Sequence, residues 1–235
     1  MAFVKTEVQG AVEIITIDRP KALNALNPEV LADLKAAFEA VDQSAIRCIV
    51  LTGEGDKSFV AGADIGSMST MTKAEGEAFG KLGNDVFLMI ESFPIPVIAA
   101  VNGFALGGGN ELAMSCDIRI CSDNAVFGQP EVGLGITPGF GGTQRLARLV
   151  GMGMAKQLVY SALNIKADEA YRIGLANAVY PQAELMENVL KLANKIAKNA
   201  PIAVRNCKKA INDGISLPIE KAVEVEEKLF GDCFE

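Results

Sequence analysis

Two glutamates stand alone in long stretches of the chain that carry no other charge. Residues 97–116 contain one charged side chain, Glu111, and residues 124–144 contain only Glu131. The chain as a whole is 22% charged, so each stretch would ordinarily hold several charges. A carboxylate among apolar neighbours resists ionisation, which raises its pKa toward neutral pH. If the two carboxylates face one small volume, they can deliver and remove a proton.

Each glutamate also has a purely structural interpretation. Glu111 falls in the first turn of an expected helix, where a negative charge complements the helix dipole, and Glu131 in FGQPEVGLG is typical of an exposed loop charge. The chain contains no histidine, which excludes Ser-His-Asp and Cys-His nucleophile systems and imidazole metal sites. Carboxylates are therefore the leading candidates for acid–base chemistry.

Two glycine-rich turns each follow an expected strand and contain small residues, VAGADI (60–65) and GFALGGGNE (103–111). Exposed N–H groups in such turns and at a helix N-terminus suit an anion, or a carbonyl oxygen that is gaining negative charge. The alternative is that the glycines only let strand and helix pack closely. A dinucleotide motif GxGxxG is absent because Leu112 stands at its last glycine position, and no phosphate-binding GxxxxGK[ST] occurs.

The elements around these residues alternate between strands and helices. Buried strands are expected at 12–18, 46–53 and 96–103, with short ones at 117–122 and 124–128. A helix is expected from Pro28, with Asn27 as its N-cap. Residues 135–146, GITPGFGGTQRL, read as an ordered turn that supports the Glu131 loop, with Thr143, Gln144 and Arg145 anchoring the next helix. This pattern predicts an α/β core with parallel pairing over residues 1–181, followed by three helices over 182–235.

Composition narrows the partners and the setting. The 235 residues are 50% hydrophobic and carry a net charge of −7, which disfavours nucleic acid and anionic membranes as partners. No apolar run is long enough to span a bilayer, and the first ten residues lack the pattern of a secretory signal. The five cysteines are scattered without CxxC spacing, so we expect reduced thiols, no metal site and a cytoplasmic protein.

Four segments, taken together and in order, carry a resemblance to the enoyl-CoA hydratase (crotonase) family: RPKALNAL, GEGDKSFVAGADI, IPVIAAVNGFALGGGNELAMSCDIRI and FGQPEVGLGITPGFGGTQRLARLVG. The resemblance runs from about Val12 to the last residue. Within the family, the chain looks most like short-chain hydratases of the 3-hydroxybutyryl-CoA dehydratase kind. It implies a crotonase-like spiral of ββα units, followed by a C-terminal helical trimerisation region, with two trimers stacked into a hexamer.

The resemblance also implies a reaction and its residues. The expected activity is the reversible syn hydration of a short-chain trans-2-enoyl-CoA, crotonyl-CoA, to 3-hydroxyacyl-CoA, with no cofactor. The thioester oxygen would lie between the backbone N–H groups of Ala63 and Gly108 and be stabilised there as it becomes negative. Glu111 would hold the water and take its proton, and Glu131 would supply the proton to the α-carbon.

Further positions match parts of the family's substrate path. The residues expected along the CoA are Lys21, Ala22, Ala63, Asp64, Ile65, Gly66 and Gly107, and Lys57 is a candidate phosphate contact. Residues 67–90 are expected to wall the acyl chain, in particular Met68, Met71, Phe79 and Phe87, although the same side chains suit ordinary core. Relatives usually continue past FGDCFE with another helix that contributes to CoA binding, so we expect part of the adenine contacts to be missing.

Two other functions remain open at this point. An enoyl-CoA isomerase on the same fold shuttles a proton with one carboxylate, and the presence of both Glu111 and Glu131 argues against it. A non-catalytic homologue that binds RNA is a different class, and the net charge of −7 argues against that.

Overall fold

The computed structural model describes residues 1–234, apart from the side chains of Ile65 and Ser67. Its main sheet contains, in spatial order, β1 (Val4–Gln9), β2 (Val12–Ile17), β3 (Cys48–Gly53), β5 (Val97–Val101), β7 (Ile118–Ser122) and β10 (Ala178–Tyr180). The strands from β2 to β10 run parallel, and β1 is an antiparallel edge strand that the sequence analysis did not predict. A second sheet contains β4 (Ser58–Ala61), β6 (Phe104–Leu106), β8 (Val126–Gly128) and β9 (Asn164–Lys166).

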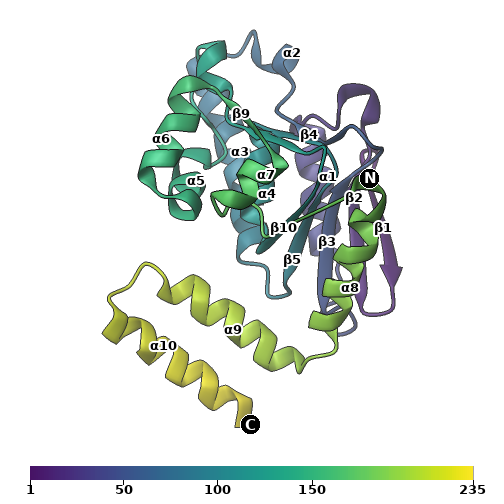
Figure 1. The fold of residues 1–235 in the computed structure, drawn as a ribbon, viewed down its shortest axis with the longest axis vertical. Helices are drawn as coiled ribbons and strands as arrows, with labels where there is room; N and C mark the ends of the chain where they lie inside the picture. Colours follow the sequence, from purple (N-terminus) through teal and green to yellow (C-terminus); the bar gives the residue numbers. More distant parts are fainter. Residues whose placement is uncertain (235) are drawn as a thin grey trace.

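The chain passes from one sheet to the other in repeated turns. A strand of the main sheet is followed by a strand of the second sheet and then by helix, as in β3–β4–α2–α3 and β5–β6–α4. Figure 1 shows these units winding beside one another. This is the expected spiral of ββα units, and the parallel pairing is confirmed.

The helices fall into a group on the body and a group at the C-terminus. Those on the body are α1 (Pro28–Glu39), α2 (Ile65–Met68), α3 (Lys73–Glu91), α4 (Gly108–Ser115), α5 (Gly142–Val150), α6 (Met152–Ser161) and α7 (Ala167–Arg172). The last three are α8 (Leu185–Ala197), α9 (Pro201–Gly214) and α10 (Ile219–Gly231). Short 3-10 turns cover Pro20–Ala22, Glu131–Leu134, Gln182–Glu184 and Asp232–Phe234.

The predicted start of α1 is confirmed. The side chain of Asn27 accepts a hydrogen bond from the N–H of Val30 at 2.8 Å, and Pro28 is the first helical residue. Proline fits there because its missing N–H would have no acceptor in the helix. The buried side of α1, which includes Leu34 and Phe38, packs into the main core.

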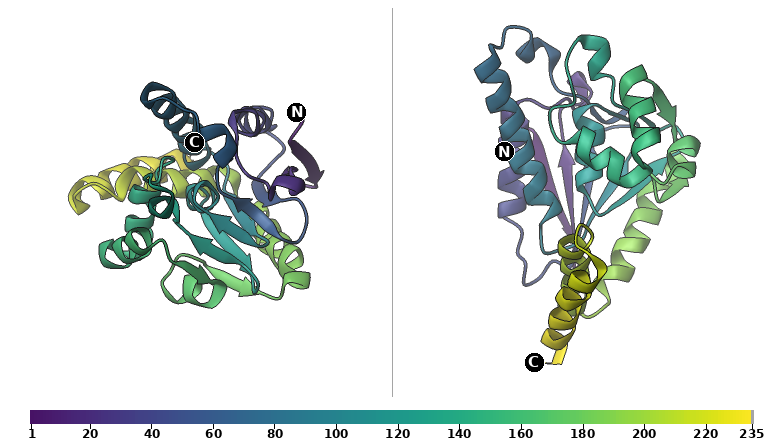
Figure 2. Two further views of the ribbon diagram at one scale, coloured as in Figure 1. Left: turned by 90° about the horizontal axis from the view of Figure 1, so that it is seen from above. Right: turned by 90° about the vertical axis from the view of Figure 1, so that its left-hand side faces the viewer.

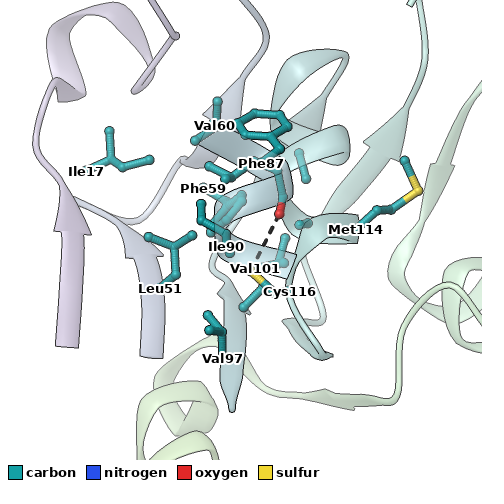
Figure 3. Close-up of a cluster of buried hydrophobic side chains, with 14 of the residues drawn as sticks. Ile17, Leu51, Phe59, Val60, Phe87, Ile90, Val97, Val101, Met114 and Cys116 are labelled. Carbon is teal, nitrogen blue, oxygen red and sulfur yellow. Dashed lines mark hydrogen bonds between the residues drawn. The ribbon is translucent and has the colours of Figure 1, made fainter. Parts of the chain in front are cut away.

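The main core lies between the two sheets and the helices α1, α3 and α4. Figure 3 shows part of it, with Phe59 and Val60 from β4 beside Phe87 and Ile90 from α3. A smaller apolar cluster lies on the other face of the main sheet, where α8 covers Val12, Val50 and Ile98, among others. Both faces of the central strands are therefore buried, as their near-continuous apolar sequences require.

Helix α8 corrects one of our expectations. The helical spacing of Leu185, Val189, Leu192 and Ile196 predicts a stripe that is buried either on the chain's own core or on a neighbouring subunit, and the resemblance to the family favours the neighbour. In the structure the stripe packs on the main sheet of its own chain. The helices α9 and α10 pair with each other at one end of the body, below it in Figure 1 and in the right-hand view of Figure 2.

Candidate active site

Glu111 is buried at the beginning of α4, with 1% of its surface exposed. The helix begins at Gly108, which places Glu111 in the first turn, as predicted. Its Oε1 atom accepts hydrogen bonds from the N–H of Phe140 at 2.9 Å and from the N–H of Gly142 at 2.7 Å. The carboxylate is therefore fixed by backbone groups that lie about thirty residues further along the chain.

Glu131 begins the 3-10 turn that follows β8, and 8% of its surface is exposed. The interpretation as an exposed loop charge is thus wrong. Gln129 donates from Nε2 to Oε1 of Glu131 at 3.2 Å, and Asn110 in turn donates to Gln129 at 2.8 Å. Among the described residues, the Oε2 atom of Glu131 has no hydrogen-bond partner, although it is buried.

Burial changes the acidity of both carboxyl groups. Loss of contact with water raises the pKa of Glu111 to about 7, and the negative charge of Glu131 contributes to the rise. The N–H groups of Gly142 and Phe140 and the charge of Arg145 act in the opposite direction. Burial also raises the pKa of Glu131. Glu111 can therefore exchange a proton near neutral pH, and Glu131 keeps its proton to a higher pH than an exposed glutamate does.

A single cavity of about 750 Å³ has both glutamates in its wall. Ala63, Gly107 and Gly108 line the same cavity, so the structure brings the carboxylates together with the two predicted backbone donors. The absence of other charges around Glu111 and Glu131 in the sequence corresponds to the apolar walls of this cavity.

The N–H group of Gly108 is positioned by the beginning of a helix, and that of Ala63 by a parallel β-bridge. Gly108 is the first residue of α4, and the N–H groups of a first helical turn have no acceptor within the helix. Ala63 lies opposite Leu26 in a parallel bridge, where the N–H of Asp64 and the carbonyl of Gly62 bond to Leu26. In that pattern the bridge uses the groups on either side of Ala63, and its own N–H is directed away from Leu26.

The glycine triplet before Glu111 serves both of the purposes considered for it. Gly107 has a φ of +50°, which favours glycine, and a Cβ added there would lie 2.8 Å from Oε1 of Glu131. A Cβ added to Gly109 would lie 1.8 Å from the carbonyl oxygen of Val60 in β4. Gly107 thus belongs to the site, while Gly109 allows helix and strand to pack closely.

The side chains expected along the acyl chain divide between the cavity and the core. Met68, Met71 and Phe79 line the cavity. Phe87 is fully buried, lies in the core drawn in Figure 3, and is not among the residues that line the cavity.

The residues expected along the CoA are more widely spaced. Lys21 and Lys57 line a second pocket of about 310 Å³, next to the 3-10 turn that ends at Ala22. Asp64 forms an ion pair with Arg19 at 2.8 Å and accepts from the N–H of Gly66 at 3.2 Å. The side chain of Ile65 is outside the described residues.

Sequence reasoning missed the groups that hold the two carboxylates. Residues 135–146 were expected to form a turn that supports the Glu131 loop, but α5 begins within them, at Gly142, and the backbone there binds Glu111. Gln129 is two residues from Glu131 and lies in the same uncharged stretch, so its position was the only signal for its contact.

The described part of the chain offers neither a cluster of metal ligands nor a membrane-spanning helix. No group of three or more Cys, Asp or Glu side chains among residues 1–234 is arranged to hold a metal ion. Within the same residues, no helix has the length and apolar character needed to cross a bilayer.

Comparison with known proteins gives matches over almost the whole chain. The chain is 60% identical to the short-chain-enoyl-CoA hydratase of Clostridium acetobutylicum, over 97% of this chain and 88% of that protein. It is 56% identical to the crotonyl-CoA hydratase of Syntrophomonas wolfei, with the same coverage. The crystal structure of enoyl-CoA hydratase from Bacillus anthracis superposes with a TM-score of 0.95 at 38% identity, over 97% of this chain and 90% of that one.

The family description Enoyl-CoA hydratase/isomerase matches residues 7–235. Together with the spiral of ββα units and the two buried glutamates in one cavity, this match shows that the chain belongs to the enoyl-CoA hydratase/isomerase family.

Proposed function

We propose that this protein is a hydro-lyase that catalyses the reversible syn hydration of short-chain trans-2-enoyl-CoA, with crotonyl-CoA giving 3-hydroxybutyryl-CoA. The observation that carries the proposal is the pair of buried carboxylates, Glu111 and Glu131, in the wall of one cavity. The names of the two relatives at 60% and 56% identity, short-chain-enoyl-CoA hydratase and crotonyl-CoA hydratase, support the substrate class.

The thioester carbonyl accepts hydrogen bonds from the N–H groups of Ala63 and Gly108. When water adds to the β-carbon, negative charge moves onto the thioester oxygen, and fixed donors stabilise that charge without having to reorient. Gly108 contributes further because it begins a helix, whose N-terminus carries partial positive charge.

The two carboxyl groups divide the atoms of water between the carbons of the double bond. Glu111 takes a proton from water as the oxygen bonds to the β-carbon, and Glu131 gives its proton to the α-carbon. In dehydration, Glu131 removes the α-proton and Glu111 protonates the departing hydroxyl. The reaction needs no cofactor, because the CoA thioester is part of the substrate.

The pair works while it holds a single proton, so kcat/KM should fall on both sides of an optimum. Burial and the charge of Glu131 raise the pKa of Glu111 to about 7. Loss of the last proton should therefore place the alkaline limb near that pH. Initial rates of hydration across a pH series measure the profile, and a rate that stays constant through neutral pH into the alkaline range would contradict this assignment.

The remaining parts of the proposal concern the substrate's other end and the assembly. Lys21 and Lys57 line one pocket together with Glu54 and Asp56, and we propose that the two ammonium groups contact the phosphates of CoA. We propose a homohexamer built from two trimers, supported by the apolar side chains that α9 and α10 expose. The free cysteines among the described residues, three of them buried, support a location in the reducing cytoplasm.

The test is the absorbance of the conjugated thioester of crotonyl-CoA, which disappears when water adds. Wild-type protein should remove it, and Glu131→Gln should lower the rate by about 10²–10⁴-fold while still binding CoA. Glu187→Gln, at an exposed position on α8, is the matched control and should retain the wild-type rate. Movement of the double bond without hydration would identify an isomerase instead, and turnover by Glu131→Gln at the wild-type rate would refute its role.

A further inference from the structure

The ring of Phe140 is seated in a notch on α3. Gly83 forms the floor of the notch, and a Cβ added to it would lie 2.3 Å from Cδ1 of Phe140. Phe79 and Phe87, one helical turn to either side, meet the Phe140 ring edge to face at 5.1 Å and 5.6 Å between centroids. The ring can take this position only because residue 83 has no side chain.

Two polar contacts hold the backbone around Phe140 to the same helix. Asn84 of α3 donates from Nδ2 to the carbonyl of Gly139 at 2.9 Å. Arg145 donates to the carbonyl of Phe140 at 2.8 Å and forms an ion pair with Glu91, at the end of α3, also at 2.8 Å. The segment 139–142 is thus fixed to α3 before, at and after the aromatic ring.

This segment is also the one that binds the carboxylate of Glu111. The N–H groups of Phe140 and Gly142 donate to a single oxygen, Oε1. A displacement of the Phe140 ring away from Gly83 would move its own N–H, which is the donor at 2.9 Å.

We propose that α3 positions the catalytic carboxylate of Glu111 through Phe140, with Gly83 as the positioning residue that seats the ring. The proposal rests on the proposed function, since it assigns Glu111 a place in that reaction. It adds to the proposed function a role for Gly83, a residue outside the cavity lining, in the geometry of the proton transfer.

The charged groups around Glu111 determine how its pKa would change if Phe140 were displaced. Glu131 faces it from the turn after β8, and Arg145 faces it from α5 while paired with Glu91 of α3. If these groups stay in place and the N–H of Phe140 moves away, the ionised carboxylate loses a stabilising donor. The pKa of Glu111 should then rise, because hydrogen bonds to the charged form favour that form.

The experiment introduces a Cβ at Gly83 and then makes room for it. In Gly83→Ala, we expect kcat to fall by about 10- to 100-fold with little change in KM. The alkaline limb of kcat/KM and the infrared titration of the Glu111 carboxyl band, assigned with Glu111→Gln, should both move to higher pH. In a Phe140→Leu background the smaller side chain accepts the Cβ, so adding Gly83→Ala should change kcat by less than about threefold.

Gly153→Ala is the matched control, since it makes the same change in α6 at an exposed position where an added Cβ meets no atom within 4 Å. It should leave kcat and both titrations unchanged. If Gly83→Ala has the kcat and infrared titration of the wild type, or if Phe140→Leu does not reduce the effect of Gly83→Ala, the positioning role is wrong. Absence of hydration by the wild-type protein would refute the proposed function, whereas the infrared titration tests the effect of Gly83 on Glu111 independently of turnover.

Discussion

At the scale of single residues, Glu111 makes a contribution to stability that depends on pH. Its pKa rises from the ordinary value of 4.5 to about 7 on folding, so the folded protein holds this proton more tightly than the unfolded chain. The stabilisation is complete below about pH 4.5 and is lost as pH rises toward about 7. A shift of this size corresponds to about 3 kcal/mol.

Replacing Glu111 by Gln should remove this dependence. The amide oxygen can still accept from the N–H groups of Phe140 and Gly142, and it carries no charge that must be buried. We therefore expect Glu111→Gln to gain in melting temperature relative to the wild type, with a gain that grows between about pH 5 and pH 7 and then levels off. Thermal unfolding at matched concentration measures it, with the exposed Glu187→Gln as control. A difference that is independent of pH would contradict the assignment.

The two glutamates could be singled out from the sequence because their isolation from other charges is visible along the chain, and the structure places both in the wall of one cavity. Their roles in proton transfer stay a prediction. The partners that fix the carboxylates could not be predicted in the same way. Glu111 is bound by N–H groups 29 and 31 residues away, and every residue except proline carries such a donor. The type of residue 140 or 142 therefore gives no signal of this contact, which depends on where α5 begins in space.

At the scale of elements, the beginning of α4 combines a structural role with the catalytic role that we propose for the N–H of Gly108. Proline is tolerated at a first helical position, and Gly108 occupies that position. A Cβ added there would approach Leu26 and Phe140 at 3.2 Å, within reach of small side-chain adjustments. The helix can therefore accept a side chain at 108 while the donor is removed.

Gly108→Pro removes the N–H, and Gly108→Ala adds a Cβ but keeps the N–H, so the two variants separate the donor from the steric effect. Loss of one oxyanion donor should lower kcat by about 10²–10³-fold more in the proline variant than in the alanine variant, with a smaller effect on KM. Circular dichroism and size measurements establish that both variants fold. Equal kcat for folded Gly108→Pro and Gly108→Ala would exclude this donor.

At the scale of the whole molecule, apolar spacing predicted burial but not the partner. The stripe on α8 has helical spacing, and its side chains are indeed covered, but by the main sheet of the same chain. Period alone cannot distinguish a sheet from a neighbouring subunit, since either surface buries the same face. The apolar strands did not identify the covering surface either, because a continuous apolar run shows only that both faces of a strand are covered.

One apolar stripe that the structure leaves exposed lies on α10. Ile219, Val223 and Phe230 recur at spacings of four and seven residues, which places them on one face of the helix, and they are 69%, 40% and 65% exposed. Phe234 packs against Phe230 and is 76% exposed. The side of α10 that faces α9 is already covered, because the two helices pack on each other (Figure 2). A stripe of this kind marks an interaction surface, and the proposed hexamer would bury it.

Charges introduced into this stripe should break the assembly without unfolding the subunit. Asp at position 219 suits the first turn of α10, so Ile219→Asp combined with Val223→Glu should retain the helix while opposing burial of the stripe. Light scattering at micromolar concentration should give a hexamer for the wild type and smaller species for this variant. Lys221→Glu changes the net charge by the same amount on the opposite side of α10, and it should remain hexameric. A wild-type monomer with full activity, or a hexamer in the double variant, would show that the α10 stripe does not hold the subunits together.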